Sequence, residues 1–166
     1  MPSGQEVLLR KAGAEGWELV HPKCARERED DLAEIHAMLA AGESEIARDE
    51  LIWLLDECHD YLDAHRLLGE LALAADDLPL ARGHFGTAWR IGQRAIQKAG
   101  DPRPVPYSLP ANQAFHESGK GLVWCLLKLD KADLAAEVVE FLVSCDPSDP
   151  LGLRRLAADG GGGSQP

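Results

Sequence analysis

The stretch that decides the fold is LLGELALAADDLPLARGHFGTA, residues 67–88 of a chain of 166 residues. Leucine and alanine recur at helical spacing until Asp76 and Asp77 interrupt the run. Aspartate can cap a following helix, and Pro79 suits a first helical turn, where a missing amide hydrogen costs nothing. A second apolar helical face begins at Leu80. The stretch therefore predicts two amphipathic helices joined by a tight turn.

The same pattern recurs along the chain. Ala47 lines up with Ala81 at an offset of 34 residues, and Ala81 lines up with Ala135 at an offset of 54. The difference of 20 residues (54 − 34) falls mostly in a proline-rich stretch, about residues 99–110, which we expect to be an inserted loop. The chain therefore divides into three predicted helix pairs, residues 28–61, 62–95 and 116–149.

The middle pair matches a known motif at Leu68, Gly69, Ala81, Phe85 and Ala88. On these residues the chain resembles the tetratricopeptide repeat family, and the segment from Asn112 to Leu153 is similar to a bacterial variant of that family. The resemblance implies an all-α fold, a right-handed superhelix of about three antiparallel helix pairs. Asp149 and Pro150 predict a further short helix, to about Ala158, that caps the end of the stack.

The two ends of the chain lack the repeat. We expect residues 1–27 to be an N-terminal extension that is partly extended or disordered. Its apolar stretch 17–22 could dock on the repeats, occupy their groove or stay disordered until bound, and the sequence leaves these alternatives open. The helical domain is expected to span residues 28–158, and the glycine-rich residues 159–166 predict a flexible tail.

The charge balance is strongly acidic. The chain has 17 basic and 28 acidic side chains, a net charge of −11. Such a chain repels nucleic acid and anionic membranes, so we expect neither as a partner. Residues 28–61 hold 11 acidic and 2 basic side chains, which is −9. This acidic first pair is either a solvated surface or a patch that steers a basic partner, and both interpretations stay open.

The N-terminal residues lack the apolar core of a secretory signal, and no apolar run approaches the length of a membrane span, which favours a cytoplasmic location. The four cysteines include no C-x-x-C pair. In a domain of this size we expect them to be reduced thiols, packed as small apolar groups: Cys24, Cys58, Cys125 and Cys145.

The resemblance also implies a function. Members of the family bind peptides or helices on a concave surface lined by the first helix of each pair. We therefore expect a non-enzymatic protein-interaction module with a protein or peptide partner and no cofactor. Alignment places these residues in the groove: His36, Leu39, Arg66, Glu70, Leu73, Lys120, Trp124 and Lys128. No asparagine occupies the positions that would clamp a terminal carboxylate, and we expect Asn112 to lie in a turn.

The groove and the ends of the repeat stack each carry a feature with further consequences for binding. Trp124 lies one helical turn from both Lys120 and Lys128. It either grips a partner together with the lysines or packs into the core beneath them. The apolar ends of a short stack also predict a homodimer.

The alternative function is a small thiol- or metal-dependent enzyme or sensor. Cys58 and His59 are adjacent, and His59 and Asp63 stand one helical turn apart, a spacing that can hold a divalent ion when further ligands converge. The sequence contains no H-E-x-x-H, phosphate-binding glycine loop or G-x-S-x-G motif. A packed helical cysteine and a solvated acidic surface explain the same residues, so we expect neither a catalytic residue nor a metal ligand.

Overall fold

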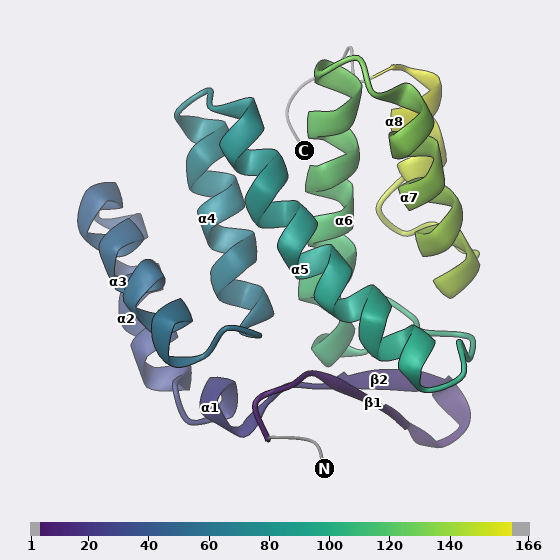
Figure 1. Cartoon of the computed structure of the whole chain (residues 1–166), viewed down its shortest axis with the longest axis horizontal. Coiled ribbons are helices and arrows are strands. Elements are labelled where there is room, and N and C mark those ends of the chain that lie inside the picture. Colours follow the sequence, from purple (N-terminus) through teal and green to yellow (C-terminus); the bar gives the residue numbers. More distant parts are fainter. Residues whose placement is uncertain (1–3, 161–166) are drawn as a thin grey trace.

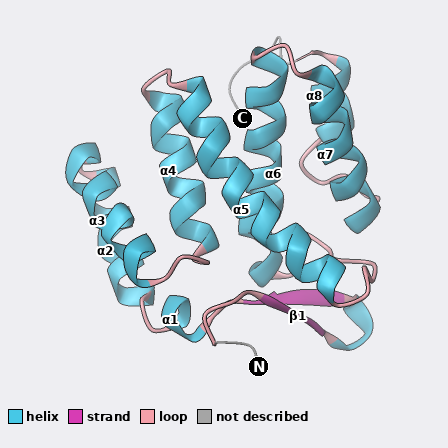
Figure 2. Ribbon diagram, in the orientation of Figure 1, coloured by secondary structure: helices cyan, strands magenta, loops and turns pink. Residues whose placement is uncertain are grey.

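The computed structural model describes residues 4–160, which are mainly helical (Figure 1; Figure 2). These residues form eight α-helices, one 3₁₀ turn and two strands. The elements are β1 (Leu8–Lys11), the 3₁₀ turn (Gly13–Glu15), β2 (Trp17–Val20), α1 (Lys23–Arg26), α2 (Glu29–Ala40), α3 (Ser44–Glu57), α4 (Leu62–Ala74), α5 (Leu78–Lys98), α6 (Pro110–Lys128), α7 (Ala132–Cys145) and α8 (Leu153–Ala158). Residues 161–166 of the predicted tail lie outside the described residues.

The predominance of helix predicted from the sequence is confirmed, and the structure adds a small two-stranded sheet that the sequence pattern did not predict. The strands β1 and β2 form a two-stranded antiparallel sheet in which Leu8 faces Val20 and Lys11 faces Trp17. Figure 1 shows this hairpin at one end of the helices, where β1 contacts α5 and β2 contacts α6. Part of the N-terminal extension is therefore an ordered β-hairpin. Strands of four residues carry too short a pattern to be distinguished from an extended loop.

Three tight turns join the helices in pairs, at residues 41–43, 75–77 and 129–131. The middle residue of each turn has a positive φ angle, 79° at Gly42, 57° at Asp76 and 58° at Asp130. The amide of the last turn residue donates to a carbonyl five residues earlier, at 2.9, 2.9 and 2.8 Å. This bond closes a helix where its chain turns back. The turns lie 34 and 54 residues apart (76 − 42 and 130 − 76), the spacing of the sequence repeat.

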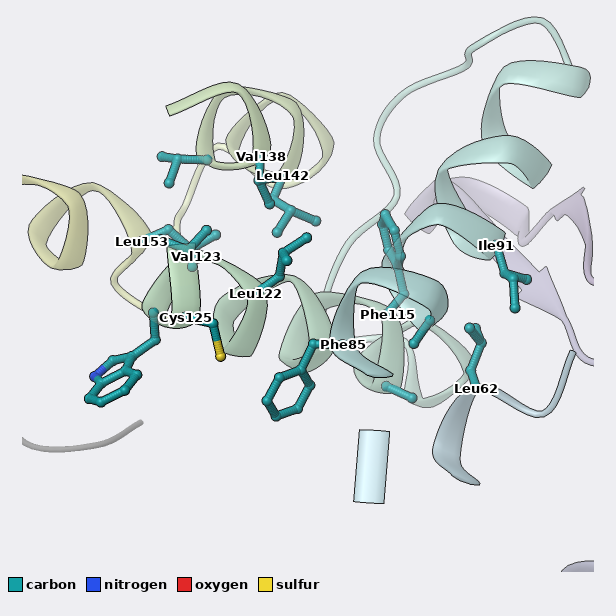
Figure 3. Close-up of a cluster of buried hydrophobic side chains, with 14 of the residues drawn as sticks. Leu62, Phe85, Ile91, Phe115, Leu122, Val123, Cys125, Val138, Leu142 and Leu153 are labelled. Carbon is teal, nitrogen blue, oxygen red and sulfur yellow. The ribbon is translucent and has the colours of Figure 1, made fainter. Parts of the chain in front are cut away.

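The ring of Phe85 packs between α4 and α6 (Figure 3). A Cβ atom at Gly69 of α4 would lie 2.6 Å from Cε1 of this ring, and one at Gly121 of α6 would lie 2.7 Å from Cε2. Neither position therefore has room for a side chain. Because the glycines of α4 and α6 leave room for the Phe85 ring of α5, these three helices can pack closely.

The buried apolar side chains form two separate clusters. The larger cluster joins α4 to α8 with the hairpin and includes Phe115 and Leu142. The smaller cluster lies among α2, α3 and α4 and includes Ile35, Leu51 and Leu67. The first helix pair therefore packs around a core of its own.

The hairpin is fixed to the helices by one buried amide. The side chain of Asn112, 0% exposed, accepts a hydrogen bond from the amide of Leu19 at 2.9 Å. It also donates to the carbonyl oxygens of Trp17 at 3.0 Å and Pro106 at 2.9 Å. Asn112 was expected in a turn, but it lies in the first turn of α6, which begins at Pro110. Of the three alternatives for the apolar stretch 17–22, the structure shows docking on the helices.

The cysteine prediction is half wrong. Cys24 and Cys58 form a disulfide, which ties the start of the chain to the end of α3. Cys24 lies in α1, where the chain turns after the hairpin, and Cys58 directly follows α3. Their approach depends on how these two segments pack, which the sequence pattern did not indicate. Cys125 and Cys145 are free and buried, as predicted, and burial raises the pKa of each thiol to about 11.

The last helix, α8, packs on α6 and α7 and places Leu153 in the larger core. It begins at Leu153, three residues later than Pro150, where the sequence predicted its start. Asp149 nevertheless caps it as expected, since its carboxylate accepts from the amides of Leu153 at 2.8 Å and Arg154 at 3.0 Å. The predicted cap at Asp77 is also present, on the amide of Leu80 at 3.1 Å.

The longest helix, α5, has 21 residues and an uneven charge. It carries four basic side chains and no acidic one: Arg82, Arg90, Arg94 and Lys98. No helix in the described part of the chain combines the length and the apolar character that crossing a bilayer requires.

Candidate partner-binding face

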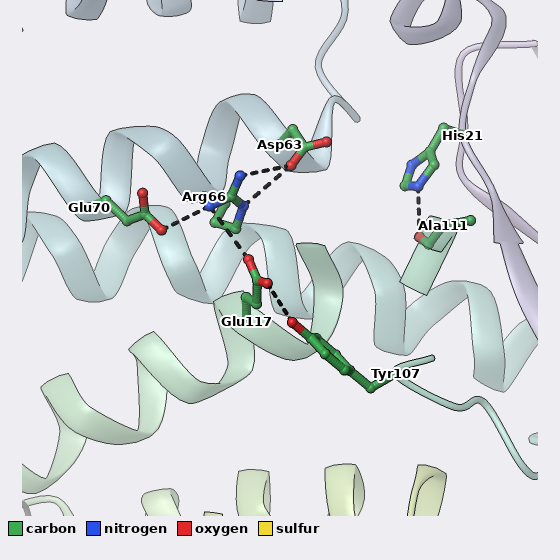
Figure 4. Close-up of polar contacts among 7 residues, drawn as sticks. All are labelled: His21, Asp63, Arg66, Glu70, Tyr107, Ala111 and Glu117. Carbon is green, nitrogen blue, oxygen red and sulfur yellow. Dashed lines mark hydrogen bonds and ion pairs between the residues drawn. The ribbon is translucent and has the colours of Figure 1, made fainter. Parts of the chain in front are cut away.

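A cluster of charged side chains surrounds Arg66 on α4 (Figure 4). Nη1 of Arg66 lies 2.8 Å from Glu70 Oε1 and 3.5 Å from Glu117 Oε2, and its Nη2 donates to Asp63 Oδ1 at 3.1 Å. The other oxygen of Glu117 accepts a hydrogen bond from the Tyr107 hydroxyl at 2.7 Å. The cluster therefore ties α4 to α6 and to the loop that precedes α6.

This arrangement fixes the charge of each group. The Arg66 side chain is 15% exposed. Burial acts to lower its pKa, but attraction to Glu70, Asp63 and Glu117 outweighs burial and raises the pKa above its usual value. The hydrogen bond to Glu117 raises the pKa of Tyr107, so the hydroxyl remains a donor. Three carboxylates and one guanidinium give the cluster a charge of −2 (1 − 3), so Arg66 is already neutralised within the protein.

The predicted stripe on α6 consists of a buried ring with basic side chains around it. Trp124 is 6% exposed, and Nζ of Lys128 lies 5.1 Å from the centroid of its ring. Lys128 is exposed and Lys120 is half-buried. The ring thus packs in the core with one lysine across its face. The lysines, rather than the indole ring, are what this part of α6 presents to solvent.

The other predicted groove residues do not share one surface environment. His36 of α2 is exposed, whereas Leu39 is half-buried against the core of the first helix pair. Leu73 of α4 is 7% exposed and belongs to the larger core. An ion pair brings Arg66 together with Glu70, and a cation–π contact brings Lys128 together with Trp124. Among the described residues, neither pair has such a contact with His36, Leu39 or Leu73.

Cys58 and His59, the residues of the alternative thiol- or metal-dependent function, lie in different surroundings from those that such a site requires. Cys58 is bonded to Cys24 and is therefore not a free thiol. His59 is exposed, with Nδ1 2.9 Å from Asp60 Oδ1, and does not pair with Asp63. Within residues 4–160 no three histidine, cysteine, aspartate or glutamate side chains are grouped so that they could hold a metal ion.

Comparison with known proteins gives no match to any family model, curated protein or solved structure. The resemblance to tetratricopeptide repeats therefore rests on the sequence pattern alone.

A second surface lies between α5 and α7, over α6. It is a groove of about 570 Å³, lined on α5 by Gly83, Gly86 and Arg90, among others, and on α7 by Leu134 and Glu137. None of the predicted groove residues lines it. The sequence carried a signal for it in Gly83 and Gly86, two of the three glycines that interrupt the helical pattern of α5.

The partners of Arg66 were only partly accessible from the sequence. Asp63 and Glu70 stand three residues before and four residues after Arg66, so helical spacing places all three on one face. Glu117 and Tyr107 come from α6 and from the inserted loop. Glu117 pairs with Arg66, and Tyr107 bonds Glu117. Both contacts depend on how α4, α6 and the loop pack together, so no local sequence pattern indicates them.

Proposed function

We propose that this chain is a non-enzymatic protein-interaction module of the tetratricopeptide type. It would take a peptide or helix of a partner protein on the face formed by α4 and α6. The arrangement proposed for α2 to α7 is a right-handed superhelix of three antiparallel helix pairs, with α8 capping its end. The acidic net charge of −11 argues against nucleic acid or an anionic membrane as the partner.

Packing within the helix pairs supports the proposed fold. The small motif residues Ala47, Ala81 and Ala135 are all fully buried, which allows close approach of the paired helices. Gly69 and Phe85 contact one another across the middle pair, in the positions that the family motif gives to a small and an aromatic residue. The three turns share one hydrogen-bond pattern.

The single observation that carries the function is the ion-pair network between α4 and α6. Arg66 and Glu117 join the two helices, and the Arg66–Glu70 pair runs along α4. A face held in this way is preorganised, so the protein loses less conformational freedom when a partner binds. Its remaining basic side chains, Lys120 and Lys128 on α6, are the groups that can pair with carboxylates of a partner.

Affinity capture from the source cell, followed by binding of the purified partner, tests the proposal. We expect the variant Lys120→Glu/Lys128→Glu to lose a partner that the wild type retains. The control is Arg154→Glu/Arg155→Glu, which makes the same change of charge at exposed positions of α8. A partner held equally by wild type and by the α6 variant would reject this face as the binding site.

A further inference from the structure

Two helical glycines have no packing reason within the chain. Glycine inside a helix is less favourable than alanine, so each one needs an explanation. At the other four helical glycines a Cβ atom would collide with a neighbouring side chain: Gly69, Gly92, Gly119 and Gly121. At Gly83 a Cβ atom would meet nothing within 4 Å, and at Gly86 it would meet only Leu122 Cδ1, at an ordinary 3.7 Å.

Both unexplained glycines line the groove of about 570 Å³ between α5 and α7. Gly83 is exposed and Gly86 is buried at the floor of the groove. Neither has a side chain, and a helix backbone can approach closely where side chains are absent. Exposed apolar residues lie at the ends of the groove helices, Leu80 on α5 (48% exposed) and Leu134 on α7 (41% exposed).

The groove wall formed by α5 is basic. Arg82 and Arg90 line it and form no ion pair with any described residue, and Glu137 on α7 is the acidic residue of the lining. The whole of α5 has four basic and no acidic side chains, a charge of +4 in a chain of net charge −11. An occupant that complements this groove is therefore acidic and apolar.

The outer face of α3 has that character. It exposes Ile46 (53%), Ile52 (47%) and Trp53 (48%), more apolar surface than a solvated helix needs. Five acidic side chains and one basic side chain give α3 a charge of −4 (1 − 5), opposite to that of α5. Glu50 and Asp56 are exposed beside the apolar residues and have no ion-pair partner among the described residues.

We propose that the groove between α5 and α7 receives α3 of a second copy of this chain, in a head-to-tail contact. Trp53 and Ile46 of one copy then pack over Gly83 and Gly86 of the next, with acidic side chains of α3 facing Arg82 and Arg90. Groove and α3 belong to different surfaces of the same molecule, so each copy keeps one free groove and one free α3. Such a contact extends into longer assemblies unless its rotation closes a ring. It uses none of the residues of the α4–α6 face and goes beyond the function proposed above.

Light scattering over a wide range of protein concentration tests this contact with two charge-reversal variants. The first variant, Arg82→Glu/Arg90→Glu, makes the groove lining acidic like α3. The second, Glu50→Arg/Asp56→Arg, takes α3 from a charge of −4 to 0 and places two arginines beside its exposed apolar residues, opposite the basic groove. We expect the wild type to grow beyond a dimer as concentration rises, and each variant alone to associate about tenfold or more weakly. An equimolar mixture of the two variants should associate again, because each acidic α3 or groove then meets a basic counterpart.

Every other outcome overturns the proposal. A wild type that stays monomeric has no such contact, and a Glu50→Arg/Asp56→Arg variant that associates like the wild type shows that the groove pairs with something other than α3. A mixture that remains monomeric excludes a contact between the two surfaces. The variant Lys120→Glu/Lys128→Glu should associate normally, so that failure of the α4–α6 proposal and failure of this one are separate results.

A glycine variant tests the groove without changing charge. Gly83→Leu places its Cβ atom where nothing lies within 4 Å and replaces glycine by a better helix former, so the thermal midpoint should not fall. The filled groove should nevertheless lose association by about tenfold or more. Gly83→Leu that associates like the wild type would show that α3 does not occupy this groove.

Discussion

The side-chain amide of Asn112 binds the backbone of Leu19, which lies 93 residues earlier in the chain, at 2.9 Å. The same side chain donates two further hydrogen bonds, to the carbonyl oxygens of Trp17 and Pro106. One buried residue at the start of α6 therefore holds the N-terminal hairpin and the inserted loop together. His21 adds a second link to α6, with Nε2 2.8 Å from the carbonyl oxygen of Ala111 (Figure 4).

Replacing Asn112 should release the hairpin. Asn112→Leu keeps a similar volume but leaves one amide and two carbonyl groups without partners in a buried site, which should lower the free energy of unfolding by about 2–4 kcal/mol. Urea denaturation measures the loss, and hydrogen exchange at the Leu19 amide should become faster. The neighbouring Gln113→Leu, at a half-buried position, is the control. Unchanged exchange at Leu19 in the Asn112 variant would contradict the role of this amide.

Glycine at position 121 should matter more than glycine at position 83. Gly121→Ala forces a Cβ atom to within 2.7 Å of the Phe85 ring and should cost about 1–3 kcal/mol. Gly83→Ala meets nothing and should raise the free energy of unfolding by about 0.5–1 kcal/mol, because alanine is the better helix former. Denaturation of both variants gives the comparison. Combining Gly121→Ala with Phe85→Leu should cost less than the sum of the single changes, and strict additivity would argue against the contact.

The sequence predicted the features that depend on residues near one another. The turn at Asp76 and Asp77 was correctly placed, because aspartate and proline interrupt the helical pattern locally. The capping roles of Asp77 and Asp149 were predicted for the same reason. The pairing of Arg66 with Glu70 could be expected from a separation of four residues on one helix.

The features that were missed depend on contacts between distant segments. The disulfide joins cysteines 34 residues apart, and the hairpin depends on Asn112. For Trp124 the sequence left both partner contact and core packing open, and the ring is buried. Helical spacing gives the direction of a side chain but not which neighbouring segment covers it.

Reduction of the disulfide should destabilise the first helix pair. Closing a loop with a sequence separation of 34 residues is worth about 3–4 kcal/mol through the entropy of the unfolded chain. Adding a reductant should therefore lower the unfolding free energy of the wild type by about that amount. The variant Cys24→Ser/Cys58→Ser keeps Cys125 and Cys145 and is the control, since the reductant should leave its stability unchanged. A wild type indifferent to reductant would mean that these thiols are not bonded in solution.

The same bond bears on where the protein resides. Disulfides persist in oxidising compartments and are rare in the cytosol. A bonded Cys24–Cys58 pair in protein taken from the source cell would argue against the cytoplasmic location predicted from the N-terminal residues. Mass spectrometry after alkylation of free thiols in denaturant, without reduction, distinguishes the two states, since unfolding exposes the buried Cys125 and Cys145. Four alkylated cysteines are expected for a cytoplasmic protein and two for an oxidised one.

Buried histidines should make the protein less stable in mild acid. Burial lowers the pKa of His65, His84 and His116 below the usual value, so the folded state binds fewer protons than the unfolded state as pH falls below about 6.5. Stability is therefore complete above that pH and declines below it, with a slope of at most about 1.4 kcal/mol per pH unit for each histidine.

His116 is the most informative, since its Nε2 lies 2.8 Å from the Val105 carbonyl oxygen. Replacing it with glutamine keeps a donor for that oxygen but removes the titrating ring, so urea denaturation at several pH values should give a flatter profile for His116→Gln than for the wild type. Asp146, whose pKa is lowered despite the opposing effect of burial because Ser148 and Tyr107 donate hydrogen bonds to it, loses its contribution only at lower pH and leaves this window undisturbed. Identical slopes in the two proteins would show that His116 takes up its proton without opening the site.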